Sequence, residues 1–222
     1  MCVTRLARVV IPGIAHHVTQ RGARRMKVFF GPEDYSLYKS LLRERARSAG
    51  VGIRAYCLMP NHVHLIVIPE RIDSLARLFR TVHSHYAELV NARRGWTGHL
   101  WQQRFASFPM HDFHLRAALD YVHWNPVRAG LAARPDDWLW TSAAVVLGQG
   151  TDDLVSSLRA FDGALTHDPG TTTEFEELRR CSRTGRPLGP NAFVRELEKR
   201  VGRPLLPQRR GPKPRSEPSG SP

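Results

Sequence analysis

Residues 51–68 read VGIRAYCLMPNHVHLIVI, and the expected fold is built outward from this stretch. Val51 to Met59 and His62 to Ile68 are rich in residues that favour β-strands, and only Pro60-Asn61 separates the two runs. Proline and asparagine between two such runs favour a turn. The stretch therefore predicts two adjacent strands joined as a tight hairpin.

Further strands and helices are indicated on both sides of this hairpin by β-forming runs and by apolar residues at helical spacing. In chain order we expect a strand over 14–20, a helix over 32–50, the hairpin, a helix over 73–95, a strand over 104–110, and a helix that Asp112 caps and Pro126 limits. The order βαββαβ plus one helix predicts the α+β class. It is typical of a ferredoxin-like or RRM-like antiparallel sheet with helices on one face.

Charge divides the chain into regions. Lys and Arg number 33 against 20 Asp and Glu, so the net charge is +13 at pH 7, which favours a polyanionic partner. Residues 1–150 and 179–222 are basic, whereas 151–178 is acidic. We expect a main domain over 1–150, an acidic linker or helical segment over 151–178, a small helical accessory region over 179–201 and a disordered basic tail over 202–222.

Two helices are expected near the C-terminus, over 173–180 and 191–201, with apolar residues on one side of each. They form either a helix-turn-helix-like accessory or a helical hairpin that packs on the main domain. The sequence does not separate these two alternatives.

The three cysteines, Cys2, Cys57 and Cys181, are odd in number and far apart. This pattern fits neither a disulfide framework nor a cysteine-rich zinc module. No apolar run approaches the ~18 residues that span a bilayer, and no secretion signal is visible. We therefore expect a cytoplasmic protein without a membrane partner.

The pattern His62-Val63-His64 opens the second strand of the hairpin. Side chains alternate across a strand, so His62 and His64 point to one face and Val63 to the other. Two imidazoles at this spacing can converge on one divalent cation. A pair of hydrogen-bonded or exposed histidines would produce the same pattern.

Tyr121 and Asn125 lie four residues apart on the third predicted helix, and therefore on one face of it. This spacing delivers a phenol and an amide together. The structural alternative is a core tyrosine followed by an asparagine that ends the helix before Pro126.

Together, these two segments resemble the single-tyrosine transposases of the His-hydrophobe-His class, and most closely the REP-associated tyrosine transposases. Supporting stretches are HVTQRG at 17–22, AYCL at 55–58 and GHLWQQRF at 98–105. The resemblance covers roughly residues 3–148 and, more loosely, GRPLG at 185–189.

This resemblance implies that His62 and His64 bind a metal, with Asn125 as the third protein ligand, and that Tyr121 is the nucleophile. Many relatives carry glutamine at the position of Asn125, and both amides offer a carbonyl oxygen. Mg²⁺ or Mn²⁺ would polarise a scissile phosphate, and attack by Tyr121 would leave a 3′-hydroxyl and a covalent 5′-phosphotyrosine. For His123 the alternatives are a fourth ligand, a proton carrier or a solvated side chain, and we expect the last.

The expected activity is that of an enzyme that nicks and rejoins single-stranded or hairpin DNA. Dimeric members of the class place the tyrosine helix of one subunit in the active site of the other, whereas the REP-associated branch acts within one chain, so the resemblance leaves both states open and favours the monomer. Five arginines suit phosphate contacts with that DNA, namely Arg21, Arg24, Arg25, Arg104 and Arg128. Trp101 and Phe105 either stack on unpaired bases or lie in the core. Two other classes stay open: a DNA-binding regulator without chemistry, and a metal-dependent hydrolase, for which further ligands are missing.

Overall fold

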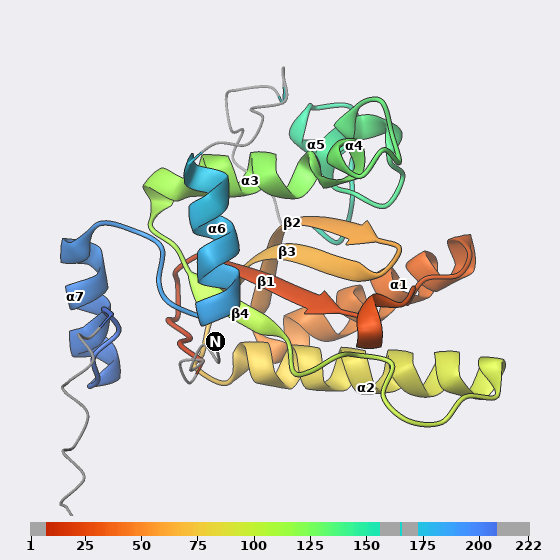
Figure 1. Cartoon of the computed structure of the whole chain (residues 1–222), viewed down its shortest axis with the longest axis horizontal. Coiled ribbons are helices and arrows are strands. Elements are labelled where there is room, and N and C mark those ends of the chain that lie inside the picture. The colour runs from red at the N-terminus through yellow and green to blue at the C-terminus, as the bar shows by residue number, and fades with distance from the viewer. Residues whose placement is uncertain (1–7, 156–164, 166–172, 208–222) are drawn as a thin grey trace, which may run out of the picture.

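The sheet of the protein has four antiparallel strands in the order β2-β3-β1-β4, as seen in a computed structural model (Figure 1). The structure describes residues 8–155, 165 and 173–207. The strands are β1 (His16–Arg21), β2 (Val51–Met59), β3 (His62–Pro69) and β4 (Ala106–Pro109). A mixed fold of helices with a four-stranded antiparallel sheet is thereby confirmed.

The helices surround this sheet. They are α1 (Pro32–Ala49), α2 (Ser74–Arg94), α3 (Leu115–His123), α4 (Asn125–Arg128), α5 (Ala143–Val146), α6 (Thr173–Thr184) and α7 (Asn191–Val201). Short 3₁₀ helices occur at η1 (Ala23–Arg25), η2 (Asp112–His114) and η3 (Pro135–Asp137). Within the described ranges, no helix is both long enough and apolar enough to cross a membrane.

The β2–β3 hairpin turns at the two predicted residues, since Met59 and His62 are Cα partners across it. Alternation along β3 then separates two sets of side chains. Val63 and Leu65 are fully buried in the core that α1 and α2 cover. His62 and His64 lie on the opposite face of the sheet, as the sequence predicts.

Helices α1 and α2 lie side by side along one face of the sheet (Figure 1). Helix α1 begins at Pro32, where the missing N–H costs nothing, and ends before Gly50, whose φ of 66° suits a glycine. Tyr38 of α1 and Phe79 of α2 have no exposed surface in the core beneath them. This layer holds the sheet rigid under the opposite face.

The opposite face carries α3 and α6, which differs from the expectation of helices on one face only (Figure 1). Ala55 and Ile66 make this face apolar as well, so water must be excluded from it too. Leu119 of α3 and Leu178 of α6 pack there and are at most 2% exposed. A strand pair that is apolar on both faces requires cover on both.

Both edges of the sheet are covered by irregular segments. At the β2 edge, the Leu58 N–H donates to the Trp140 carbonyl at 2.8 Å. At the β4 edge, the His111 N–H donates to the Leu188 carbonyl at 2.8 Å, and Leu188 donates to Pro109 at 3.0 Å. These contacts satisfy backbone groups that an open edge would expose.

The third predicted helix is divided into three pieces. Asp112 lies inside η2, and the side chain of His111 instead accepts the Phe113 N–H at 3.2 Å, so Asp112 is not the cap. Helix α3 ends at His123, and Pro126 lies in the first turn of α4 rather than ending the helix. A proline is tolerated there because first-turn N–H groups have no helical partner.

The beginning of the expected tail is packed rather than free. Leu205 is 1% exposed and contacts Val9 and Ile11 in a small cluster with α7. The Glu198 carboxylate accepts the Leu205 N–H at 2.7 Å. Residues 208–222 lie outside the described residues, so the structure describes only the first part of the segment expected to be disordered.

Candidate active site

A third histidine joins the predicted pair. His17 on β1 places its Nε2 3.0 Å from Nδ1 of His64, and the two rings stack with centroids 5.2 Å apart. On the other side of His64, the His62 ring centroid lies 4.9 Å away. His62 Nδ1 donates to Asn61 Oδ1 at 2.6 Å. The three imidazoles thus form a row across neighbouring strands.

Tyr121 on α3 stands over this row. Its ring centroid is 5.6 Å from that of His64 and 5.9 Å from that of His17, in edge-to-face contacts. Helix α3 packs on β2 and β3, which places the tyrosine on the histidine face of the sheet. The structure therefore brings together Tyr121 and the histidine pair that the sequence singled out.

Asn125 follows Tyr121 across the break between α3 and α4. Its Nδ2 donates to the Tyr121 carbonyl at 2.7 Å, which satisfies a backbone acceptor that the end of α3 leaves open. The amide nitrogen therefore has the helix-ending role that was one alternative. Its Oδ1 has no hydrogen bond among the described residues, so that oxygen is available to ligate a cation.

Helix α6 and Arg128 also contact Tyr121. The Phe175 ring centroid lies 5.3 Å from that of Tyr121, and the Arg128 guanidinium lies 5.1 Å and 4.8 Å from the two rings. Arg128 also donates to the Tyr121 carbonyl at 2.6 Å. The pKa of Arg179 on α6 is raised, first by its hydrogen bond to Glu176 and then by its interaction with Tyr121.

Burial keeps the three imidazoles neutral. It lowers the pKa of His17 and of His62 to about 3, and the charge of Arg21 adds to the effect at His62. The pKa of His64 is lowered well below its usual value, mainly by burial, and then by the adjacent His62 and His17 rings and by Arg21 and Arg128. Neutral imidazole is the form that ligates a metal ion.

The donor set fits a divalent cation. Nδ1 of His62 is hydrogen-bonded to Asn61, and Nδ1 of His64 is hydrogen-bonded to His17. Nε2 of both rings is therefore left for a ligand. This second hydrogen bond is the usual support of a metal-binding histidine. Within the described residues, no group of three His, Cys, Asp or Glu side chains could hold a metal. Among the other side chains singled out from the sequence, Asn125 Oδ1 is an amide oxygen that could serve as the third protein donor.

Four of the five predicted DNA-contacting arginines lie near one end of β1. Arg21 ends β1 and is the Cα partner of His62, and Arg24 and Arg25 are exposed in η1 directly after it. Arg104 is exposed and lines a small pocket together with Arg21. Arg128, in contrast, is half-buried under Tyr121 as described above.

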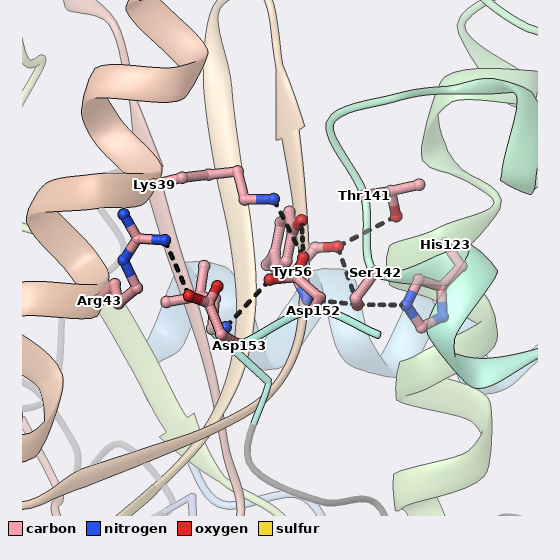
Figure 2. Close-up of polar contacts among 9 residues, drawn as sticks. Lys39, Arg43, Tyr56, His123, Thr141, Ser142, Asp152 and Asp153 are labelled. Atoms are coloured by element: carbon pink, nitrogen blue, oxygen red, sulfur yellow. Dashed lines mark hydrogen bonds and ion pairs between the residues drawn. The ribbon is translucent and has the colours of Figure 1, made fainter. Parts of the chain in front are cut away.

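His123 does not face solvent, which corrects the expectation from sequence. It is fully buried, burial lowers its pKa to about 3, and its Nε2 lies 2.9 Å from Ser142 Oγ. Ser142 Oγ accepts the Tyr56 N–H at 2.9 Å, and Figure 2 shows this chain from α3 to β2. A histidine two residues from Tyr121 points to the other side of the helix, so it fastens α3 to the sheet.

The same network continues into residues that the sequence placed in an acidic segment (Figure 2). Tyr56 donates its hydroxyl proton to Asp152 at 2.5 Å, and Lys39 of α1 donates to the same carboxylate at 3.0 Å. Arg43 pairs with Asp153 at 2.9 Å. These aspartates therefore have partners on α1 and β2.

Sequence reasoning gave no role to three residues of this site: His17, Phe175 and Arg179. His17 opens the HVTQRG stretch, and its place on the face of His64 depends on the β1–β3 register, in which Thr19 is opposite His64. Phe175 and Arg179 lie more than fifty residues after Tyr121 in the chain. No local spacing connects them with the tyrosine.

Comparison with known proteins agrees with this fold and site. A family model described as "Transposase IS200 like" matches residues 11–125. The REP-associated tyrosine transposase of Escherichia coli (strain K12) is 22% identical over 105 residues, which are 47% of this chain and 61% of the relative. A Haemophilus influenzae protein provisionally given the same name is 27% identical over 99 residues, or 40% of this chain and 56% of the relative. The chain thus matches less than two thirds of either relative's length.

A solved structure of a REP-associated tyrosine transposase bound to a REP hairpin has the same fold. It aligns with a TM-score of 0.56 at 21% identity and covers 74% of this chain and 94% of that chain. This likeness shows the fold. The family model spans more than half of the chain, and the chain belongs to the IS200-like transposase family. Its homology to the REP-associated tyrosine transposases is confirmed.

Proposed function

We propose that this chain is a metal-dependent transposase that nicks and rejoins single-stranded or hairpin DNA through a covalent bond to Tyr121. One observation carries this proposal: the Tyr121 ring stands 5.6 Å from that of His64, whose free nitrogen is available to a cation. A tyrosine in a passive core would not require a row of neutral histidines beneath it, two of them, His17 and His64, buried. Family membership supports the same activity.

Three donors would hold Mg²⁺ or Mn²⁺, namely Nε2 of His62, Nε2 of His64 and Oδ1 of Asn125. The bound ion would polarise the scissile phosphate. Tyr121 Oη forms a bond to phosphorus while the bond between phosphorus and the 3′ oxygen breaks. The phenolic proton is transferred to that 3′ oxygen, which leaves as a hydroxyl. One phosphoester replaces another, so a different 3′-hydroxyl can reverse the step, and no nucleotide cofactor is needed.

DNA is the proposed partner because the chain is strongly basic and Arg21, Arg24 and Arg25 gather beside His62. These arginines suit contacts with phosphates close to the cleaved bond. The proposed active unit is a monomer, because the Tyr121 ring contacts that of His64 within its own chain.

The test is a labelled pool of hairpin oligonucleotides with randomised flanks, incubated with Mg²⁺ or Mn²⁺ and analysed under denaturing conditions. Wild-type protein should form an adduct that resists denaturation, whereas Tyr121→Phe should bind the hairpins and form none. The matched control is Tyr35→Phe, which removes a hydroxyl on the α1 face and should keep the adduct. Hairpin binding without any adduct by the wild type would instead identify a DNA-binding regulator, and a nucleotide found on another residue would overturn the assignment.

A further inference from the structure

A cavity of about 570 Å³ lies between α2 and the segment Gly98–Phe105. That segment follows α2 and runs back along it towards β4 (Figure 1). Helix α2 contributes one face, with Ala76, Phe79, Arg80 and His83 at helical spacing. The cavity is therefore on the side of the sheet opposite Tyr121, and its size is typical of a ligand pocket.

Flat aromatic rings form part of its wall. Phe79, Trp101 and Phe105 line the cavity, and Trp101 is fixed because its indole N–H donates to the His83 carbonyl at 3.0 Å. The Arg8 guanidinium carbon lies over the Phe105 ring, 3.5 Å from its centroid. Fixed rings and a guanidinium plane are the surfaces on which unpaired bases stack.

The charge of the wall is positive. Arg8, Arg80 and Arg104 line the cavity, and no aspartate or glutamate is among the described residues that do so. A ligand that fits both properties is planar and anionic. A nucleotide has this chemistry, whether it belongs to a DNA strand or is free in solution.

A second, smaller pocket connects this cavity with the tyrosine face. It shares Gln20, Gln102, Gln103 and Arg104 with the larger cavity. It also includes Thr19 and Arg21, which are the Cα partners of His64 and His62. The two pockets share this wall at the end of β1, where the Gln102 N–H donates to the Arg21 carbonyl at 2.9 Å. A strand that leaves the histidine row there has to pass only this wall to reach the aromatic cavity.

We infer that this cavity binds an unpaired nucleotide of the same DNA strand that Tyr121 acts on, with its base against Trp101 and its phosphate at Arg80 or Arg104. The inference rests on the proposed function for the identity of the strand. A stacked base of this kind should strengthen binding of a flanked hairpin about tenfold over a blunt one.

The test uses hairpins with a short thymidine flank on the 5′ or the 3′ side, in which one base is 5-iodouracil, a photoreactive base of nearly the same size as thymine. After irradiation, one flank should crosslink to the peptide that contains Trp101, as identified by mass spectrometry. Crosslinks that map only to other peptides would overturn the inference. Loss of the crosslink in the presence of millimolar thymidine monophosphate would also overturn it, since the cavity would then be a site for free nucleotides.

A charge reversal supplies the second measurement. Arg80→Glu should remove most of the tenfold gain from the flank and leave the affinity for the blunt hairpin within about twofold. Arg47→Glu makes the same charge change on an exposed residue of α1 and should keep the gain. Adduct formation at Tyr121 without any effect of the flank defeats this inference alone. Crosslinking at Trp101 without an adduct defeats the proposed chemistry and leaves the cavity as a DNA site.

Discussion

Replacing Ser142 by alanine tests whether the buried network in Figure 2 holds the tyrosine helix in place. Ser142 has no exposed surface, and its hydroxyl accepts the Tyr56 N–H at 2.9 Å and lies 2.9 Å from His123 Nε2. Ser142→Ala leaves both of these buried groups without a partner. Each such loss costs about 1–3 kcal/mol, so we expect a loss of about 2–6 kcal/mol in the free energy of unfolding.

The assay is urea unfolding at neutral pH. A loss in the middle of this range corresponds to a melting temperature about 8–16 °C lower for a chain of this length. His123→Leu removes the imidazole, one of the two groups that Ser142→Ala leaves without a partner. The loss of unfolding free energy caused by Ser142→Ala should therefore be smaller in the His123→Leu protein than in the wild type, by at least about 0.5 kcal/mol. Ser48→Ala is the matched control, because the Ser48 hydroxyl is exposed and bonds only its own helix. A loss under about 0.5 kcal/mol for Ser142→Ala, or an unchanged cost beside His123→Leu, would refute the reasoning.

The remaining predictions concern protonation, metal binding and the cover on the tyrosine. Burial holds His83 and His123 at a pKa of about 3, whereas histidines of the unfolded chain titrate near a pKa of ~6.5. The free energy of unfolding should therefore fall as the pH drops from about 7 to 5, by up to ~1.4 kcal/mol per pH unit for each histidine. Urea titrations that give the same free energy across this pH range would contradict this. His17→Leu should weaken Mn²⁺ binding about 10–100-fold in a titration followed by electron paramagnetic resonance, whereas the same change at His85 should not, and equal affinities would show that His17 does not orient His64. Phe175→Ala should slow adduct formation by Tyr121 while hairpin affinity stays within about twofold, measured against Phe113→Ala, which alters a side chain that is 75% exposed.

Local patterns in the sequence were sufficient for most of the scaffold. The β2–β3 hairpin depends on two β-forming runs and a two-residue turn, and its strand bounds agree with the prediction within one residue. Helix α7 occupies the predicted residues 191–201. Alternation along a strand placed His62 and His64 on one face before any partner strand was known. Each of these features is decided by neighbours within a few residues.

Features that depend on distant parts of the chain were not predictable in the same way. The hydrogen bond between His17 and His64 requires the register of β1 on β3, which no spacing within either strand reveals. The solvated interpretation of His123 was wrong because Ser142 and the edge of β2 close over it. The contact of Phe175 with Tyr121 joins α6 and α3, two helices that pack together although these residues are more than fifty positions apart in the chain.

The same register connects stability with the site. Six consecutive residue pairs align β1 with β3 without irregularity, whereas β2 shifts against β3 between Ile53 and Ala55, away from the histidines. A slip of one residue would exchange the faces of every side chain on the strand. It would send Val63 towards α3 and His64 into the core of α1 and α2. Burying an imidazole in the core under α1 and α2 is costly, and this cost disfavours the slipped register. The pairing of β1 with β3 therefore specifies both the apolar core and the arrangement of the histidine row.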